Sequence, residues 1–392
     1  MPRPAPHIPG VPESGTRRIF ELALTLDDVV MLVVGEPDDP VAPHIRAAAQ
    51  AAWERDDTDY APNGGIAALR RAITAKLARE NDVSVDVEQV WVTVGGTQAL
   101  AQAFTIALGP GDEVLVPDPG YTTFTMYPRS IAAVPVPYPL RPSRGFVPDV
   151  EELARLVTPR TRAIVVNSPS NPLGVVFDED VIASLVVFAA DHDLWIISDE
   201  VYEHFTWDAP HVSTAAVAAR LGEQDRVLSV FSTSKSHALT GARVGWLVVP
   251  PGYGPTMRAL QESMIACAGM PDQHAALAAL EGGDAHIRAA RERYRRHISL
   301  ATELLDARGI RSHRPGGAFY LWVDVSHATE GDVAAWAERF LLDERVAVAP
   351  GTAFGRAGEG SIRLCLAASE DDIRRAVALL PAPDPAAIGG SE

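Results

Sequence analysis

Short apolar runs recur between about residue 90 and residue 250, and segments with helical periodicity separate them. The runs are VWVTV at 90–94, EVLVP at 113–117, AIVVN at 163–167, LWIIS at 194–198 and VLSVF at 227–231. Most are apolar on both faces, which is typical of strands buried in a parallel sheet. A further strand is predicted over 243–249, and helical stretches such as 179–190 supply the crossovers. The pattern predicts a doubly wound α/β sheet.

The spacing of apolar positions also places one helix before the first of these strands. Apolar residues at positions 66, 69, 73 and 77 fall on one helical face, and Lys76 is expected to point elsewhere.

The character of the chain changes beyond about residue 284. A long arginine-rich helical stretch leads to Gly309, and apolar strands are predicted at 319–325 and 362–367, which indicates a second, smaller α/β domain. The N-terminal segment is too short to fold alone and is expected to pack with that domain. We expect an N-terminal arm and part of the small domain in 1–44, a large domain in 45–284 and the rest of the small domain in 285–392. Residues 1–15 are expected to form an irregular arm, and the chain from Pro381 a loose tail.

Composition narrows the class of protein. Of the 392 residues, 47% are hydrophobic and 22% are charged, as in a globular domain. The formal net charge of -17 disfavours binding to nucleic acid or anionic lipid. The longest apolar run, Val181–Ala190, is too short to span a bilayer, and the proline-rich N-terminus lacks a signal-peptide core. We therefore expect a cytoplasmic protein that binds neither nucleic acid nor membrane.

Cysteine and histidine give no sign of a metal or a disulfide framework. Cys267 and Cys365 are the two cysteines, they lie far apart in the sequence, and the eleven histidines show no metal-ligand spacing. Both cysteines are expected to be small buried hydrophobic residues, and no metal site is predicted.

Candidate chemistry follows the predicted strands, where a doubly wound sheet binds its ligands. Gly96 and Thr97 open a helix, and free N–H groups at a helix start favour a phosphate. The segments after the other strands bring polar side chains to the same edge: Tyr121, Asn171, Asp199, Tyr202, Ser232, Ser234 and Lys235. Each of these residues alone is weak evidence for a ligand site, because turn residues commonly follow strands.

Together these motifs are more specific. Lys235, preceded by small hydroxyl residues and followed by ALTGARVGW, resembles the lysine segment of the class I and II aminotransferases. The resemblance extends from about Arg18 to Leu380. Its further motifs occur in the family's order: VGEPD at 34–38, GGTQAL at 95–100, NPLG at 171–174, SDEVYE at 198–203, PGGAFY at 315–320 and SIRLCLA at 361–367. It implies a fold type I enzyme that uses pyridoxal 5'-phosphate, with a mostly parallel seven-stranded sheet in a three-layer sandwich and a smaller α/β domain.

The resemblance also implies roles around the cofactor ring. Lys235 would hold the cofactor as a Schiff base and move a proton during the reaction. Asp199 would pair with the pyridine nitrogen and keep it protonated. Tyr202 and Asn171 would hydrogen-bond the phenolic oxygen, and Tyr121 would lie against the ring face.

The phosphate, by the same resemblance, would be held by the Gly96–Thr97 helix start, by Ser232 and Ser234, and by Arg243. Arg243 lies eight residues after Lys235, as the family's phosphate arginine does. Tyr60 matches a tyrosine that reaches the phosphate of the neighbouring subunit, which implies a homodimer.

On the substrate side, the resemblance implies that Arg363 grips the α-carboxylate, with Gly35 and Asn171 contacting the same group. Some dicarboxylate-specific relatives carry a lysine at the position of Thr97, and others use an arginine near 266–273, where this chain has no basic residue. A hydrophobic or aromatic amino acid is therefore expected as donor, with a 2-oxo acid such as 2-oxoglutarate as acceptor.

The implied reaction is ping-pong transamination through Lys235. The alternative is another outcome on the same cofactor, above all a lyase that eliminates at Cβ and cleaves a C–S bond, because motifs around the ring fix the cofactor better than the reaction. A sensory domain that binds pyridoxal phosphate without turnover is a rival from a different class, and the acidic charge disfavours it.

Overall fold

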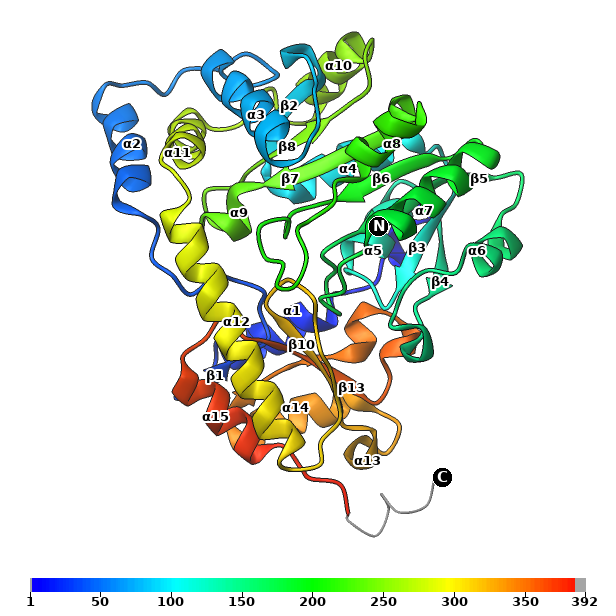
Figure 1. The fold of residues 1–392 in the computed structure, drawn as a ribbon, viewed down its shortest axis with the longest axis vertical. Coiled ribbons are helices and arrows are strands. Elements are labelled where there is room, and N and C mark those ends of the chain that lie inside the picture. The colour runs from blue at the N-terminus through cyan, green and yellow to red at the C-terminus, as the bar shows by residue number, and fades with distance from the viewer. Residues whose placement is uncertain (1, 385–392) are drawn as a thin grey trace.

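The computed structural model describes residues 2–384, and its main feature is a seven-stranded sheet (Figure 1). The strand order is β2 (Val90–Val94), β8 (Val244–Val248), β7 (Val227–Ser232), β6 (Trp195–Asp199), β5 (Thr161–Asn167), β3 (Glu113–Asp118) and β4 (Val134–Pro139). β8 runs antiparallel to both its neighbours, and the other pairs are parallel. The predicted mostly parallel seven-stranded sheet is confirmed.

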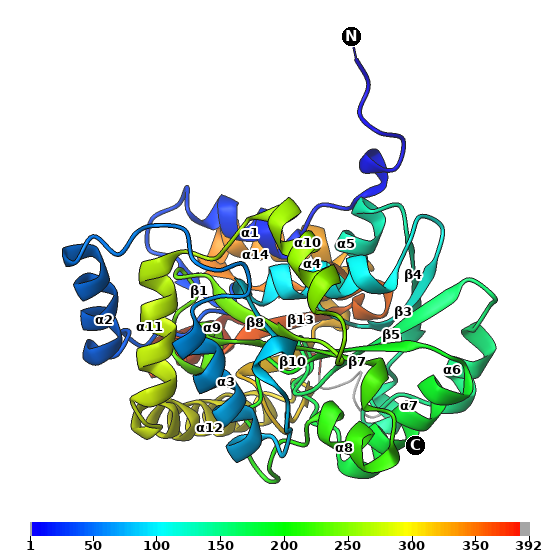
Figure 2. The ribbon, with the colours of Figure 1, turned by 90° about the horizontal axis from the view of Figure 1, so that it is seen from above.

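The central strands are buried on both faces, as their apolar runs predicted. Ile164 and Ile196 pack into one hydrophobic cluster, whereas Val165 and Ile197 pack into another, because successive side chains of a strand point to opposite faces. Helices α4 (Gly95–Ala107), α5 (Thr123–Ser130) and α10 (Gly254–Met264) lie on one side of the sheet (Figure 2). On the other lie α3 (Ala67–Glu80), α6 (Val150–Leu156), α7 (Glu179–Asp191) and α8 (Thr214–Leu221). The result is a three-layer sandwich.

The edge strand β4 was not predicted. Its sequence VPVPYP carries three prolines, which cannot donate to a sheet ladder and are confined largely to edge strands. β4 pairs on one side alone, with β3, so the edge position explains both the composition and the missing apolar run.

A smaller four-stranded antiparallel sheet lies below the first in Figure 1, in the order β12 (Ala349–Pro350), β13 (Ser361–Cys365), β10 (Tyr320–Asp324) and β9 (Ser312–His313). Its helices are α12 (Ala285–Asp306), α13 (Ser326–Thr329), α14 (Val333–Glu344) and α15 (Glu370–Leu379). Near the N-terminus, β1 (Val30–Met31) pairs with β11 (Val346–Ala347), and α1 (Gly15–Ala23) packs against α14. α2 (Pro43–Glu54) packs against α11 (Met270–Glu281).

Helix α3 confirms the predicted apolar face but contradicts the prediction for one residue. Leu69, Ile73 and Leu77 are fully buried, as expected. Lys76 is buried as well, because its ammonium group lies 2.5 Å from the Glu203 carboxylate. Periodicity alone cannot reveal a lysine that has a buried partner far along the chain.

None of the helices within residues 2–384 is long and apolar enough to cross a membrane. The predicted tail from Pro381 lies mostly outside the described residues.

Candidate active site

One cavity of about 280 Å³ lies where the carboxyl ends of the parallel strands meet the smaller sheet. Twelve of the thirteen residues predicted for the site line it: Gly35, Gly96, Thr97, Tyr121, Asn171, Asp199, Tyr202, Ser232, Ser234, Lys235, Arg243 and Arg363. The thirteenth, Tyr60, does not line the cavity, and 89% of its surface is exposed. Residues from distant parts of the chain thus meet in one place.

Lys235 lies on the short helix α9 (Thr233–Ser236), which begins directly after β7. Its Nζ donates a hydrogen bond to the backbone oxygen of Gly35, at 2.6 Å. Burial lowers the pKa of Lys235 to about 8, with Arg363 and Arg243 acting in the same direction. The amine is therefore much easier to deprotonate than an ordinary lysine.

Gly35 is required for this contact because the backbone and Tyr320 approach closely there. A Cβ atom at this position would lie 1.9 Å from the Tyr320 hydroxyl oxygen, so no other residue fits without moving the tyrosine.

Asp199 is the last residue of β6 and is almost completely buried. Burial raises its pKa to about 7, and one backbone N–H, that of Val201, contacts the carboxylate at 3.3 Å. None of the ion pairs found within residues 2–384 involves this carboxylate. A buried carboxyl group that lacks an ion-pair partner suits a ligand that brings a protonated nitrogen.

Arg363 is held in a fixed orientation between two aromatic rings. Its guanidinium carbon lies 4.3 Å from the ring centroid of Tyr320 and 4.8 Å from that of Phe354. Nη1 donates to Asn171 Oδ1 at 2.9 Å and Nη2 to the backbone oxygen of Val33 at 2.6 Å, whereas Nε has no partner among the described residues. A buried, unsatisfied N–H on a planar cation is well suited to a carboxylate ligand.

The hydroxyl groups of Tyr202 and Tyr320 lie 2.6 Å apart. Burial raises the pKa of Tyr202 well above its ordinary value, and Tyr320 acts in the same direction, so the phenol is held neutral as a potential donor.

The start of α4 forms a cradle for an anion. No side chain caps this helix, and Gly95 adopts a left-handed φ of 73°. A Cβ atom on Gly95 would lie 2.5 Å from Nη2 of Arg243, so this guanidinium lies directly beside the helix start. Ser232 Oγ lies 2.7 Å from Ser234 Oγ on the same wall. Free N–H groups, hydroxyls and a guanidinium match a phosphate.

Sequence reasoning missed several side chains of the cavity, among them Tyr320, Phe354 and Arg17. Tyr320 ends the motif PGGAFY, but its contact with Tyr202, which places it in the cavity, can be recognised only from the fold. Phe354 ends a short 3₁₀ helix (Gly351–Phe354), which is too short to leave a periodic pattern, and Arg17 lies in the first turn of α1, close to the predicted irregular arm.

Comparison with known proteins decides the family. A family model described as aminotransferase class I and II matches residues 27–380. The chain belongs to the class I and II aminotransferases. It is 40% identical to the aspartate/prephenate aminotransferase of Thermus thermophilus over 353 residues, which is 89% of each chain. It is 39% identical to the arginine–pyruvate transaminase of Pseudomonas aeruginosa, over 89% of this chain and 88% of that protein.

The fold of this aminotransferase matches solved structures equally well. A double mutant of the Thermus thermophilus aspartate aminotransferase superposes with a TM-score of 0.90 at 39% identity, over 97% of this chain and 99% of that one. These matches confirm the family and the transaminase assignment that the sequence predicted. The family depends on pyridoxal phosphate.

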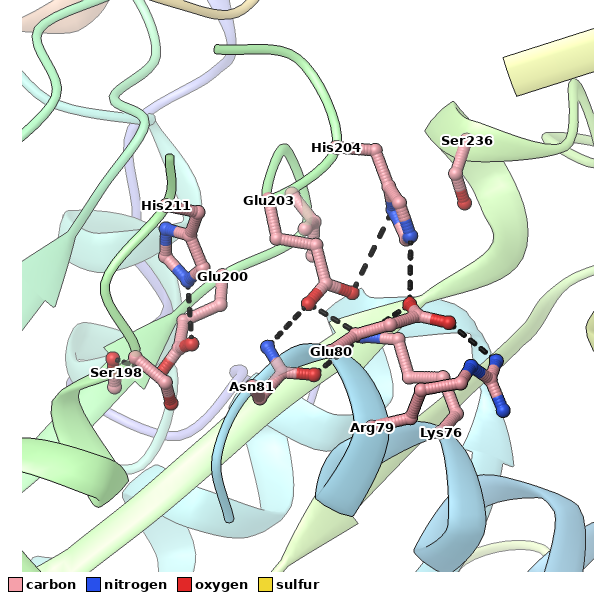
Figure 3. Close-up of polar contacts among 12 residues, drawn as sticks. Lys76, Arg79, Glu80, Asn81, Ser198, Glu200, Glu203, His204, His211 and Ser236 are labelled. Atoms are coloured by element: carbon pink, nitrogen blue, oxygen red, sulfur yellow. Dashed lines mark hydrogen bonds and ion pairs between the residues drawn. The ribbon is translucent and has the colours of Figure 1, made fainter. Parts of the chain in front are cut away.

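Two buried carboxylates, Glu200 and Glu203, anchor the segment that follows β6 (Figure 3). Glu203 contacts Lys76 at 2.5 Å and accepts a hydrogen bond from Asn81 Nδ2 at 2.6 Å. Glu200 lies 2.8 Å from His211 Nε2. Glu200 lies two positions before Tyr202 and Glu203 directly after it, so the contacts of these two carboxylates restrain the backbone that carries the tyrosine.

Proposed function

We propose that this aminotransferase moves an amino group between an L-amino acid and a 2-oxo acid by a ping-pong mechanism through Lys235, with pyridoxal phosphate bound in the cavity. The observation that carries the proposal is that three ionisable groups line one cavity without an ion-pair partner among residues 2–384. A buried carboxylate (Asp199), a buried amine with a lowered pKa (Lys235) and an anion cradle at Arg243 are complementary to the ring nitrogen, the aldehyde and the phosphate of that cofactor.

Each of these groups would hold one part of the cofactor. Asp199 would pair with the ring nitrogen, and its carboxylate charge would keep that nitrogen protonated. Tyr202 and Asn171 would bind the phenolic oxygen, and Tyr121 would lie against the ring. The phosphate would be bound by the Gly96–Thr97 N–H groups, the two serines Ser232 and Ser234, and Arg243. When bound, the cofactor supplies an electron sink for the pair released at the substrate Cα.

The chain's own residues would supply binding and proton transfer. Arg363 would bind the substrate α-carboxylate through its free Nε, with its plane already fixed by the two flanking rings. Asn171 and Gly35 would line the same end of the pocket. The Lys235 amine would be the base that takes the proton from the substrate Cα and moves it during amino transfer. A lysine pKa of about 8 lets a useful fraction of the amine be neutral near pH 7.5.

For the donor, we propose an uncharged L-amino acid with a hydrophobic or aromatic side chain. Apolar side chains of Phe20, Val34, Leu100 and Phe354 contribute to the cavity wall and support this preference. The relatives are named for different substrates, aspartate and prephenate in one case and arginine in another, so membership of the family leaves the donor open.

We also propose a homodimer in which Tyr60 reaches the phosphate site of the neighbouring subunit. The support is its position: the side chain is 89% exposed and makes no contribution to its own cavity. A cytoplasmic location stays a prediction.

A panel of amino acids, each tested with 2-oxoglutarate and with pyruvate as acceptor, tests the proposed function. We expect amino transfer that requires a 2-oxo acid and that is fastest with an uncharged donor. Release of ammonia and pyruvate from cysteine conjugates, without any acceptor, would instead identify a lyase.

A further inference from the structure

Three arginines line the cavity, and the proposed function uses two of them. Arg243 lies at the phosphate cradle, and Arg363 is buried between two rings at the α-carboxylate end. The third, Arg17, lies in the first turn of α1, and the proposed function gives it no group of the cofactor or substrate to bind. A cation at the wall of a substrate cavity changes which substrates the cavity can bind.

Arg17 is weakly engaged within the chain. Its Nε lies 3.4 Å from Glu21 Oε1, one turn further along the helix, and both side chains are about two-thirds exposed, at 64% and 67%. Pairs of this kind contribute little because water screens them and holding two long side chains in place costs entropy. The guanidinium lies over the Phe20 ring, with its carbon 5.3 Å from the centroid. A ligand carboxylate inside the cavity could therefore recruit this cation at small cost.

Hydrogen-bonding groups lie beside it. Thr16 lines the same cavity, and its hydroxyl oxygen is buried without a hydrogen-bond partner among the described residues. Ser14, the N-cap of α1, lines the cavity too. A buried hydroxyl that lacks a partner is unusual in a protein and suits a ligand oxygen.

A ping-pong reaction binds two substrates in turn at one site, and a dicarboxylic acceptor brings a charge that an apolar donor lacks. Since Arg363 takes the α-carboxylate, a second carboxylate enclosed by apolar walls would lose its hydration without a counter-charge. Arg17 is the remaining arginine of the lining.

We propose that Arg17, assisted by the Thr16 hydroxyl, binds the second carboxylate of a dicarboxylic 2-oxo acid acceptor of the size of 2-oxoglutarate. This inference rests on the proposed function. It supplies from the N-terminal helix the basic residue that the sequence lacks at Thr97 and over 266–273.

The kinetic test compares Arg17→Met with Arg18→Met in the holoenzyme. Arg18 is the neighbouring arginine of the same helix, pairs with Glu338 and does not line the cavity, so it controls for loss of charge. We expect Arg17→Met to lower kcat/KM for 2-oxoglutarate about tenfold or more, as for loss of a hydrogen bond to a charged group. The kcat/KM for pyruvate and for the best uncharged donor should change less than about twofold, and Arg17→Lys should restore part of the loss.

A binding measurement gives a second readout that needs no turnover. Calorimetric titration with succinate and with butyrate compares a dicarboxylate and a monocarboxylate of equal chain length. Arg17→Met should weaken succinate about tenfold and leave butyrate unchanged. Equal effects on both ligands, or none on either, would overturn the role of Arg17. A wild-type protein that transfers no amino group to any 2-oxo acid would contradict the proposed function, and the succinate–butyrate comparison would still decide the inference.

Discussion

Replacing Lys76 by methionine should destabilise the protein more than any surface substitution on the same helix. Lys76 is 2% exposed and Glu203 is 9% exposed, and their charged atoms lie 2.5 Å apart. Burial acts to raise the pKa of Glu203, but Lys76, His204 and His211 together lower it below its ordinary value. The methionine leaves a buried carboxylate without its main counter-charge.

Removing one partner of a buried ion pair costs about 3–5 kcal/mol. Asn81 continues to donate to the Glu203 carboxylate at 2.6 Å, and His204 Nδ1 lies 3.8 Å from it, so we expect the lower end of that range. The predicted loss in the free energy of unfolding is therefore about 3 kcal/mol at pH 7. The double variant Lys76→Met/Glu203→Leu should recover most of it, because no buried charge is left.

The loss should also depend on pH. In the wild-type protein the pKa of Glu203 is below its unfolded value, so its stabilising contribution is present above that value and is lost as the pH falls through the folded pKa. In Lys76→Met the folded pKa rises, and the carboxyl becomes easier to protonate. The difference in stability between the two proteins should consequently shrink from pH 8 to pH 5.

Urea denaturation, followed by circular dichroism at pH 5, 7 and 8, measures this series, and Arg71→Met on the same helix is the control for an exposed charge. A loss of less than about 1 kcal/mol in Lys76→Met at pH 7, the median worth of an exposed pair, would refute the reasoning. So would a double variant less stable than the single one.

Three further predictions concern the active site. Asp199→Asn should lower kcat at least about 100-fold with the cofactor still bound, because a neutral amide cannot hold the ring nitrogen protonated; steady-state kinetics and an absorbance spectrum measure the two effects. Arg363→Lys should lower kcat/KM for amino acids about 100-fold, because an ammonium group cannot replace a planar guanidinium that is stacked between two aromatic rings. An unchanged kcat/KM would contradict the assignment of the α-carboxylate site. The rate at which the cofactor-free protein captures pyridoxal phosphate should rise about tenfold per pH unit up to about 8 and then level off, because the neutral amine of Lys235 is the reacting form; a rate independent of pH between 6 and 8 would exclude the lowered pKa.

Much of the fold could be predicted because its strands are buried on both faces. A strand such as AIVVN at 163–167 leaves an apolar run that periodicity detects, and the loop after it then marks the ligand edge of the sheet. The proline-rich edge strand β4 leaves no such run, and the buried Lys76 has its partner more than one hundred residues away. Both depend on tertiary contacts that local patterns do not record.

The residues of the site also fall into those that the sequence predicts and those that only the fold reveals. Asp199 ends strand β6, and Lys235 lies in the short helix that follows β7, so their positions could be inferred from the sequence. Tyr320 and Phe354 enter the site only because the smaller sheet packs against the cavity, where they hold Arg363. Arg17 lies in the N-terminal helix α1, far from Arg243 and Arg363 in the sequence. No motif or spacing in the sequence indicates that these three arginines line the same cavity.

The most direct test of the central claim is a single half-reaction, observed by absorbance. The purified holoenzyme is mixed with an excess of its best amino acid donor and no acceptor. We predict that the visible absorbance of the bound cofactor disappears in the wild-type protein with release of one equivalent of 2-oxo acid, and that Lys235→Ala gives neither change. A Lys235→Ala protein that still released 2-oxo acid at the wild-type rate would contradict the account.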